Sequence, residues 1–169
     1  MRAGRDERAH VRGAQQGSVS DLEALFRNHW PRAHRAAYLV THDAAAAEDI
    51  AQESFLAAIR ALDSFDRRRP FGPWLHRIVV NRAIDWTRAR RLRAEVELSE
   101  TVPAANATAA PGNDLLAALA RLAPEHRGVI VMRYLLEFTP GEIAEALDLP
   151  RGTVNSRLRR GLDTLAEEL

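Results

Sequence analysis

Seven polar side chains near the C-terminus have the types and the spacing that DNA recognition requires. They lie on one predicted helix, and the stretch from Arg151 to Arg160 holds four arginines and no acid. The seven are Arg151, Thr153, Asn155, Ser156, Arg157, Arg159 and Arg160. Arginine binds guanine edges and phosphates, asparagine pairs with adenine, and short hydroxyls bind to either. We therefore expect this face to enter the major groove of duplex DNA.

Two short helices joined by a tight turn would present that face. Thr139 is the expected N-cap of the first helix, because Pro140 takes the first helical position and Glu142 completes a capping box. A turn at Asp148 leads to Pro150, which opens the second helix. The apolar positions that we expect to pack inward are Val154, Leu158, Leu162 and Leu165. The pattern predicts a helix-turn-helix; a helical hairpin with a solvated basic face is the alternative.

Composition excludes several classes of protein. The chain has 169 residues, no cysteine and a formal net charge of +1, and every basic residue is arginine. The lack of cysteine excludes disulfides, cysteine-zinc sites and thiol redox sensing. The sequence also contains no apolar run of membrane-spanning length and no signal-peptide pattern. We expect a soluble, cytoplasmic protein whose basic charge is concentrated locally.

The first part of the chain is expected to be a helical domain over residues 18–93. A capping box at Ser20 starts its first helix, and Pro31 predicts a kink or a break in that helix. Two further helices are expected at residues 41–62 and 73–93. Residues 1–17 are polar and rich in glycine and arginine, and we expect a disordered N-terminal tail there.

The second part is expected to be a separate helical domain over residues 113–169. Residues 94–112 have no helical periodicity, and a structureless stretch of that length indicates a flexible linker. After it, helices are expected from Asn113 and from Pro124 to about Leu136, followed by the helix-turn-helix. No strand pattern is present, so the predicted fold class is all-α, with two small helical domains.

An acidic face in the first domain could bind a partner. Asp49, Gln52 and Glu53 are spaced so that one side of a helix carries all three. Such a face suits docking on a basic surface, and a merely solvated face is the alternative. Paired carboxylates can also act as general acid and base. No nucleophile or glycine-rich loop accompanies them in the sequence, so we do not expect an enzyme.

A basic, aromatic segment follows in the same domain. Residues 67–93 contain nine arginines and one acid, Asp85. With Phe71, Trp74 and Trp86 nearby, these arginines could hold single-stranded DNA through phosphate contacts and base stacking. Packing in the core is the alternative for the tryptophans, and we favour it for Trp86.

Four blocks in this order carry a resemblance to a known family. They are D-A-A-A-A-E-D-I-A-Q-E-S-F-L, P-F-G-P-W-L-H-R-I-V-V-N-R-A-I-D, L-A-P-E-H-R-G-V-I-V-M-R-Y and G-T-V-N-S-R-L-R-R. The chain resembles bacterial sigma-70 transcription initiation factors of the small extracytoplasmic-function group, which have only sigma regions 2 and 4. The resemblance covers roughly residues 20–93 and 113–169.

The resemblance implies a role for each set of residues. Asp49, Gln52 and Glu53 would bind the β′ clamp helices of core RNA polymerase. The helix-turn-helix would read the −35 element of promoter DNA and rest on the β flap. An anti-sigma factor would be a further partner, and no cofactor or metal is implied. Residues 63–72 and the helix after them would capture the melted −10 element, with a flipped base held in the loop; the implied −10 set is Arg67, Arg68, Phe71, Trp74, Arg77, Asn81, Arg82, Asp85 and Arg88.

Two positions depart from the family pattern, and two other functions compete. Asn155 stands where lysine or arginine is usual, and Gly161 stands where alanine is usual, which suggests close packing or a bend. A helix-turn-helix regulator that binds operator DNA without polymerase is the main alternative. A metal enzyme using His29, His34 and His42 is disfavoured, because their spacing suits no ligand set and the sequence has no H-E-x-x-H pattern.

Overall fold

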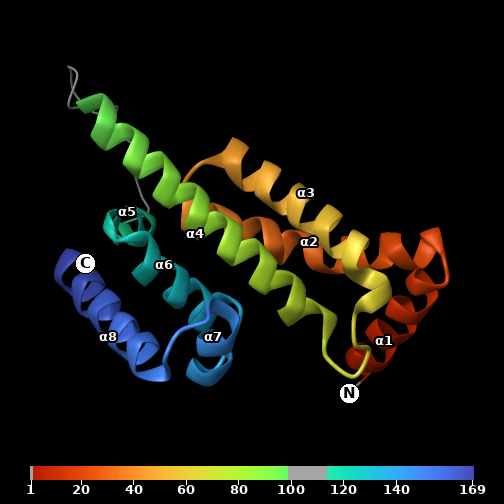
Figure 1. The fold of residues 1–169 in the computed structure, drawn as a ribbon. Helices are drawn as coiled ribbons and strands as arrows, with labels where there is room; N and C mark the ends of the chain where they lie inside the picture. The colour runs from red at the N-terminus through yellow and green to blue at the C-terminus, as the bar shows by residue number, and fades with distance from the viewer. Residues whose placement is uncertain (1, 99–113) are drawn as a thin grey trace.

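A computed structural model describes residues 2–98 and 114–169, and within them the chain forms helices and turns without a strand (Figure 1). The all-α prediction is thereby confirmed for the described residues. In order, the elements are α1 (Arg2–Gln15), α2 (Val19–Thr41), α3 (Ala44–Ala61), the 3-10 turn η1 (Leu62–Ser64), α4 (Phe71–Leu98), α5 (Asp114–Arg121), α6 (Pro124–Ile130), the π-helical turn η2 (Val131–Leu135), α7 (Pro140–Leu147) and α8 (Arg151–Glu168).

Helices α2, α3 and α4 pack together as the body of the N-terminal half. The capping box predicted at Ser20 is wrong: the N-cap of α2 is Ser18, two residues earlier, whose side chain accepts a hydrogen bond from the Asp21 N–H at 3.3 Å. Asp43 caps α3 in the same way. Of the kink or break predicted at Pro31, the break is wrong, since α2 continues through this residue to Thr41. Packing of its buried face offsets the one backbone hydrogen bond that proline removes.

The N-terminal tail is the largest error of the sequence-based prediction. Residues 2–15 form helix α1, which packs against α2, η1 and α4. Val11 is only 2% exposed and belongs to the core. The polar composition hid the apolar contacts that Val11 and Ala14 make with the core, so the disordered tail is wrong for these residues.

Helix α4 is longer than predicted. It extends through Leu98, so the linker does not begin at residue 94, and the expectation for residues 99–112 lies outside the described residues. Among the helices that the structure describes, none has the length and apolar character needed to cross a membrane.

The C-terminal half contains the predicted helix-turn-helix, α7 and α8. The capping box is confirmed: Glu142 N–H donates to Thr139 Oγ1, and the Glu142 carboxylate accepts from the Thr139 N–H at 2.7 Å. Leu162, expected inside, is 40% exposed, and Gly161 takes the inward position. A Cβ at Gly161 would lie 2.6 Å from Ile130 Cδ1, so glycine allows α8 to approach α6 closely.

The two halves pack against each other through one continuous core. In Figure 1, α4 lies between α2 and α3 on one side and α6, α7 and α8 on the other. A Cβ at Gly128 of α6 would lie 2.5 Å from Ile84 Cδ1 of α4, so glycine lets these helices cross closely without a shift of Ile84. Arg127, only 5% exposed, donates to the Val40 carbonyl of α2 at 2.5 Å. The two helical domains are therefore present and share an interface.

Candidate nucleic-acid interface

The polar face of α8 is open to solvent, as the sequence predicts. Arg151, Asn155, Ser156, Arg159 and Arg160 are exposed, and Thr153 and Arg157 are half-buried. On the opposite side the buried residues are Val154, Leu158, Gly161 and Leu165. Within residues 2–98 and 114–169, none of the four arginines forms an ion pair with a carboxylate. Apart from Arg157, whose charge acts on Glu125 of α6, the basic charge of this face is therefore available to phosphates.

A left-handed residue sets the angle between α7 and α8. Asp148 ends α7 with φ 52°, and the Leu149 N–H donates to the Ala144 carbonyl at 2.9 Å. Pro150 then leads directly into α8. This turn directs α8 away from α7, with its apolar side toward α6, and leaves the arginines outward.

The candidate −10 residues on α4 form more contacts within the protein than the candidate −35 residues on α8 do. Asn81 donates its amide to the Ala146 carbonyl of α7 at 3.0 Å, so the C-terminal half covers it. Arg82 donates to Glu53 at 3.1 Å. Arg88 lies 3.8 Å from Asp85 and donates to a carboxylate of α6 at 2.6 Å. Only Arg77 and Asp85 of the α4 set face solvent without a hydrogen-bonded partner among the described residues.

The carboxylate that Arg88 contacts is Glu125, at the start of α6. Burial would raise the pKa of Glu125, but the hydrogen bond from Arg88, a backbone hydrogen bond at Glu125, the charge of Arg88 and, least, the charge of Arg157 hold that pKa below its usual value. Glu125 thus stays ionised and links α4 to the two helices of the C-terminal half.

A cleft of about 350 Å³ separates the start of α4 from α7. Arg69, Trp74 and Arg77 line one wall, and Glu142 and Glu145 line the other. Trp74 and Arg77 of the candidate −10 set therefore lie opposite an acidic wall of the C-terminal half.

The aromatic residues of this region belong mainly to the core. Phe71 is 4% exposed, so the expectation that it offers a stacking surface to DNA is wrong. Trp74 is half-buried, with ring centroids 4.5 Å from Phe65 and 5.6 Å from Phe71. Trp86 packs against the core beneath Arg90, whose guanidinium lies 5.2 Å from the ring centroid, which bears out the core alternative.

The loop between η1 and α4 presents its arginines. Arg67, Arg68 and Arg69 are exposed, and Arg68 donates to Asp66 at 3.0 Å. This side-chain hydrogen bond is the main reason that the pKa of Asp66 lies below its usual value. A second bond, from the Arg69 N–H to the Asp66 carbonyl at 2.9 Å, shapes the loop as a turn.

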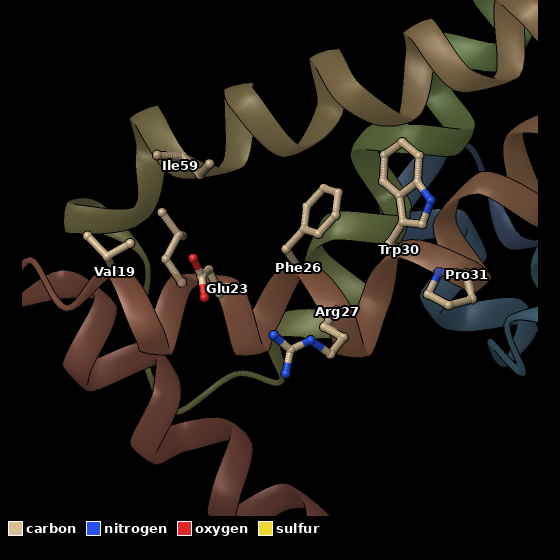
Figure 2. A pocket seen from close by; sticks show the side chains of 8 residues that line it. Val19, Glu23, Phe26, Arg27, Trp30, Pro31 and Ile59 are labelled. Atoms are coloured by element: carbon tan, nitrogen blue, oxygen red, sulfur yellow. The ribbon is translucent and has the colours of Figure 1, made fainter.

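The acidic face of α3 is exposed at all three predicted positions, Asp49, Gln52 and Glu53. Farther along α3, Leu56 and Ile59 are 50% and 40% exposed. Ile59 borders an apolar groove with a volume of about 550 Å³. Figure 2 shows the side chains that line it, with the rings of Phe26 and Trp30 projecting from α2. Sequence reasoning missed this groove, although Phe26 and Trp30 at an interval of four would stack on one face of a helix.

The three histidines considered as metal ligands have separate structural roles. His29 lies 2.9 Å from Glu7, His34 stacks on Trp30, and His42 ends α2 in the left-handed conformation. No group of three or more potential ligands occurs among the residues that the structure describes.

Comparison with known proteins shows similarity to sigma factors in both halves of the chain. Residues 25–93 match the family model of sigma-70 region 2, and residues 112–165 match that of sigma-70 region 4. The chain is 31% identical to the ECF RNA polymerase sigma factor SigW of Bacillus subtilis (strain 168), with 94% of this chain and 92% of SigW covered.

Two solved structures are also similar. CnrH, solved in complex with the cytosolic domain of CnrY, has 28% identity and a TM-score of 0.71, with 96% of each chain covered. The sigma factor RpoE, solved with the anti-sigma factor NepR from Bartonella quintana, shares the fold at 23% identity with a TM-score of 0.70, covering 89% of this chain and 97% of RpoE.

Proposed function

We infer the function from the premise that the chain belongs to the sigma-70 family of RNA polymerase sigma factors, in the extracytoplasmic-function group. The protein is a transcription initiation factor that binds core RNA polymerase and directs it to promoters. Members of this family are not enzymes, and we propose no catalytic residue. We propose that it acts in the cytoplasm, where its polymerase and its DNA are found.

The observation that carries the residue-level proposal is the arginine face of α8, whose guanidiniums form no ion pair with a carboxylate among the described residues. We propose that this face enters the major groove at the −35 element, with Arg157 and Arg160 as its central contacts. Arg160 is exposed, and Arg157 is half-buried beside Glu125, so it can reach DNA with its stem already held by packing. Asn155 adds an amide suited to adenine.

We propose that residues 18–93 supply the other two contacts. The exposed side chains of Asp49, Gln52 and Glu53 would dock on the β′ clamp helices. The loop with Arg67 and Arg68, together with the exposed face of α4, would hold the melted −10 strand. In this proposal Phe71 and Trp74 support the loop from the core and do not stack on bases.

The contact between α4 and α7 affects which residues of α4 can reach DNA. Asn81 cannot face DNA while its amide is bonded to the Ala146 carbonyl. We propose that the two halves separate at this contact when both engage polymerase. The remaining partner is an anti-sigma factor, a proposal supported by family membership and by the RpoE–NepR complex of the same fold.

In vitro transcription with core polymerase on a promoter library tests the function. A sigma factor will direct initiation from templates that share a −35 and a −10 element, and a gel shift will require core polymerase. The alternative, an independent helix-turn-helix regulator, predicts binding to duplex DNA without polymerase and no directed initiation. That result would overturn the proposal.

A further inference from the structure

Helix α1 lies outside the residues matched by either family model, and the proposed function does not use it. It is nevertheless fixed to the rest of the fold. Val11 is buried in the core, and His10 lies 2.8 Å from the Asp21 carboxylate at the start of α2. These contacts give α1 a defined position relative to the residues that it packs against.

One face of α1 points at the loop that joins η1 to α4. Glu7, Val11 and Gln15 follow each other at intervals of four residues and therefore share this face. The Gln15 amide donates to the Leu62 carbonyl at 2.8 Å and to the Phe65 carbonyl at 3.1 Å. Both bonds fix the point where the chain leaves η1 and the loop begins.

Glu7 fixes the other end of the loop. Its carboxylate accepts from the N–H of Phe71, the first residue of α4, at 3.3 Å. The residue before Phe71 is Pro70, whose side chain cannot cap a helix, so Glu7 replaces the missing cap. The hydrogen bond from His29 to Glu7 lowers the pKa of this carboxyl and keeps it ionised, which the N-terminus of a helix favours.

We propose that α1 is a positioning element for the −10 loop, residues 62–71, with Glu7 and Gln15 as its positioning residues. This inference rests on the proposed role of the loop in capturing a −10 base. Between its two anchored ends the loop exposes Arg67, Arg68 and Arg69. Anchoring both ends removes conformational freedom before DNA arrives, so less ordering is needed on binding.

The test compares Gln15→Glu with Gln16→Glu. The first change places a carboxylate opposite two carbonyl oxygens, whereas the second makes the same chemical change at an exposed neighbour with no side-chain contact among the described residues. Glu7→Ala and the exposed Asp6→Ala form a second matched pair. Each full-length variant is assembled with core polymerase and assayed on templates with a pre-melted −10 region, in four versions that differ at one −10 base.

We expect Gln15→Glu and Glu7→Ala to reduce discrimination among the four bases by roughly fivefold, the loss that corresponds to about one hydrogen bond. Core affinity and −35 dependence should remain those of the controls, and the thermal midpoint should fall by only about 2–4 °C, because each change removes an anchoring hydrogen bond. Unchanged base discrimination would overturn the inference about α1, and so would a parallel loss of core affinity and −35 dependence, which indicates general destabilisation. If the unmodified protein itself fails to discriminate, the proposed role of the loop is wrong.

Discussion

Arg82 on α4 donates to the carboxylate of Glu53 on α3, with 3.1 Å between Nη1 and Oε2. The two side chains are 41% and 66% exposed, so the pair contributes at most about 1 kcal/mol to stability. Its importance is geometric: the acidic face proposed for polymerase docking borders the basic face proposed for the −10 strand.

Separate substitutions should divide these two functions. Glu53→Ala is expected to weaken core polymerase binding by about tenfold, the loss of one charge-assisted hydrogen bond, and to leave the free energy of unfolding nearly unchanged. Arg82→Ala should slow promoter opening at saturating core. Titration of fluorescent protein with core polymerase measures the first effect, with the exposed Asp63→Ala as control. Core affinity that survives Glu53→Ala would contradict the docking face.

Arg160→Ala tests the face of α8. Because this guanidinium has no carboxylate partner among the described residues, its loss should cost no stability. We expect transcription from a duplex promoter to fall by about tenfold, within the range for one base or phosphate contact. Core affinity should not change. The control is Arg35→Ala, an exposed arginine on α2; equal activity of the two variants would show that α8 does not read the −35 element.

The close crossing of α4 and α6 can be tested with substitutions that add or remove one methyl group at the contact. Gly128→Ala introduces a Cβ only 2.5 Å from Ile84 Cδ1 and should destabilise the fold by about 1–3 kcal/mol. Ile84→Val removes the nearer of two conflicting carbons and leaves Cγ1 at 3.0 Å, so the double variant should recover part of that loss. Urea denaturation measures both. Gly152→Ala, where nothing lies within 4 Å of the new Cβ, is the matched control.

Arg127 should be among the most sensitive positions in the chain. Its guanidinium donates to the carbonyls of Val40, Ala120 and Leu122, and burial lowers its pKa only to about 10, so it is charged at neutral pH. Arg127→Met leaves these acceptors unpaired and should cost roughly 3 kcal/mol or more. Arg121→Met, which removes an exposed ion pair with Glu168, should cost under about 1 kcal/mol by the same denaturation assay.

Stability should fall as the solution becomes acidic, because two histidines are held neutral. Burial lowers the pKa of both His42 and His76 to about 4, and nearby cations add to the effect. Between the unfolded value and about 4, the unfolded chain binds protons that the folded chain does not. The free energy of unfolding should therefore drop by up to about 1.4 kcal/mol per pH unit for each histidine below pH 6.5, and stay flat above it.

Single substitutions separate the contributions of these two histidines to the pH dependence of stability. His42→Asn keeps a residue that tolerates the left-handed conformation, φ 52°, and removes one titrating group. His76→Leu removes the other from a site that is 5% exposed. Each variant should show a shallower dependence of unfolding free energy on pH in urea titrations. An unchanged slope in either variant would show that the corresponding ring is not the titrating group.

Local signals were sufficient for most of the helices. The capping box of Thr139 and Glu142 depends on residues three positions apart and was predicted, whereas the one predicted at Ser20 was misplaced because Ser18 caps α2. The acidic face of α3 and the arginine face of α8 followed from helical spacing alone. Pro31 misled because packing along the whole of α2 outweighs the loss of one backbone hydrogen bond.

Contacts between distant segments could not be predicted. Gln15 bonds to Leu62 and Phe65, and Arg127 bonds to Val40, across separations that no periodicity encodes. Phe71 was assigned to DNA from its type, but its burial depends on α2 and α1. Gly128 and Gly161 carry no side chain, so their role appears only where a neighbouring isoleucine occupies the space.

The anchored ends of the −10 loop also make it suitable for spectroscopy. Since the chain has no cysteine, cysteines introduced at the exposed positions Arg8 and Arg67 would be the only thiols available for spin labels. One label would sit on α1 and the other on the loop that Glu7 and Gln15 hold. A narrow distribution of label separations in the free protein, broadened by Gln15→Glu, would report directly how rigidly the loop is presented.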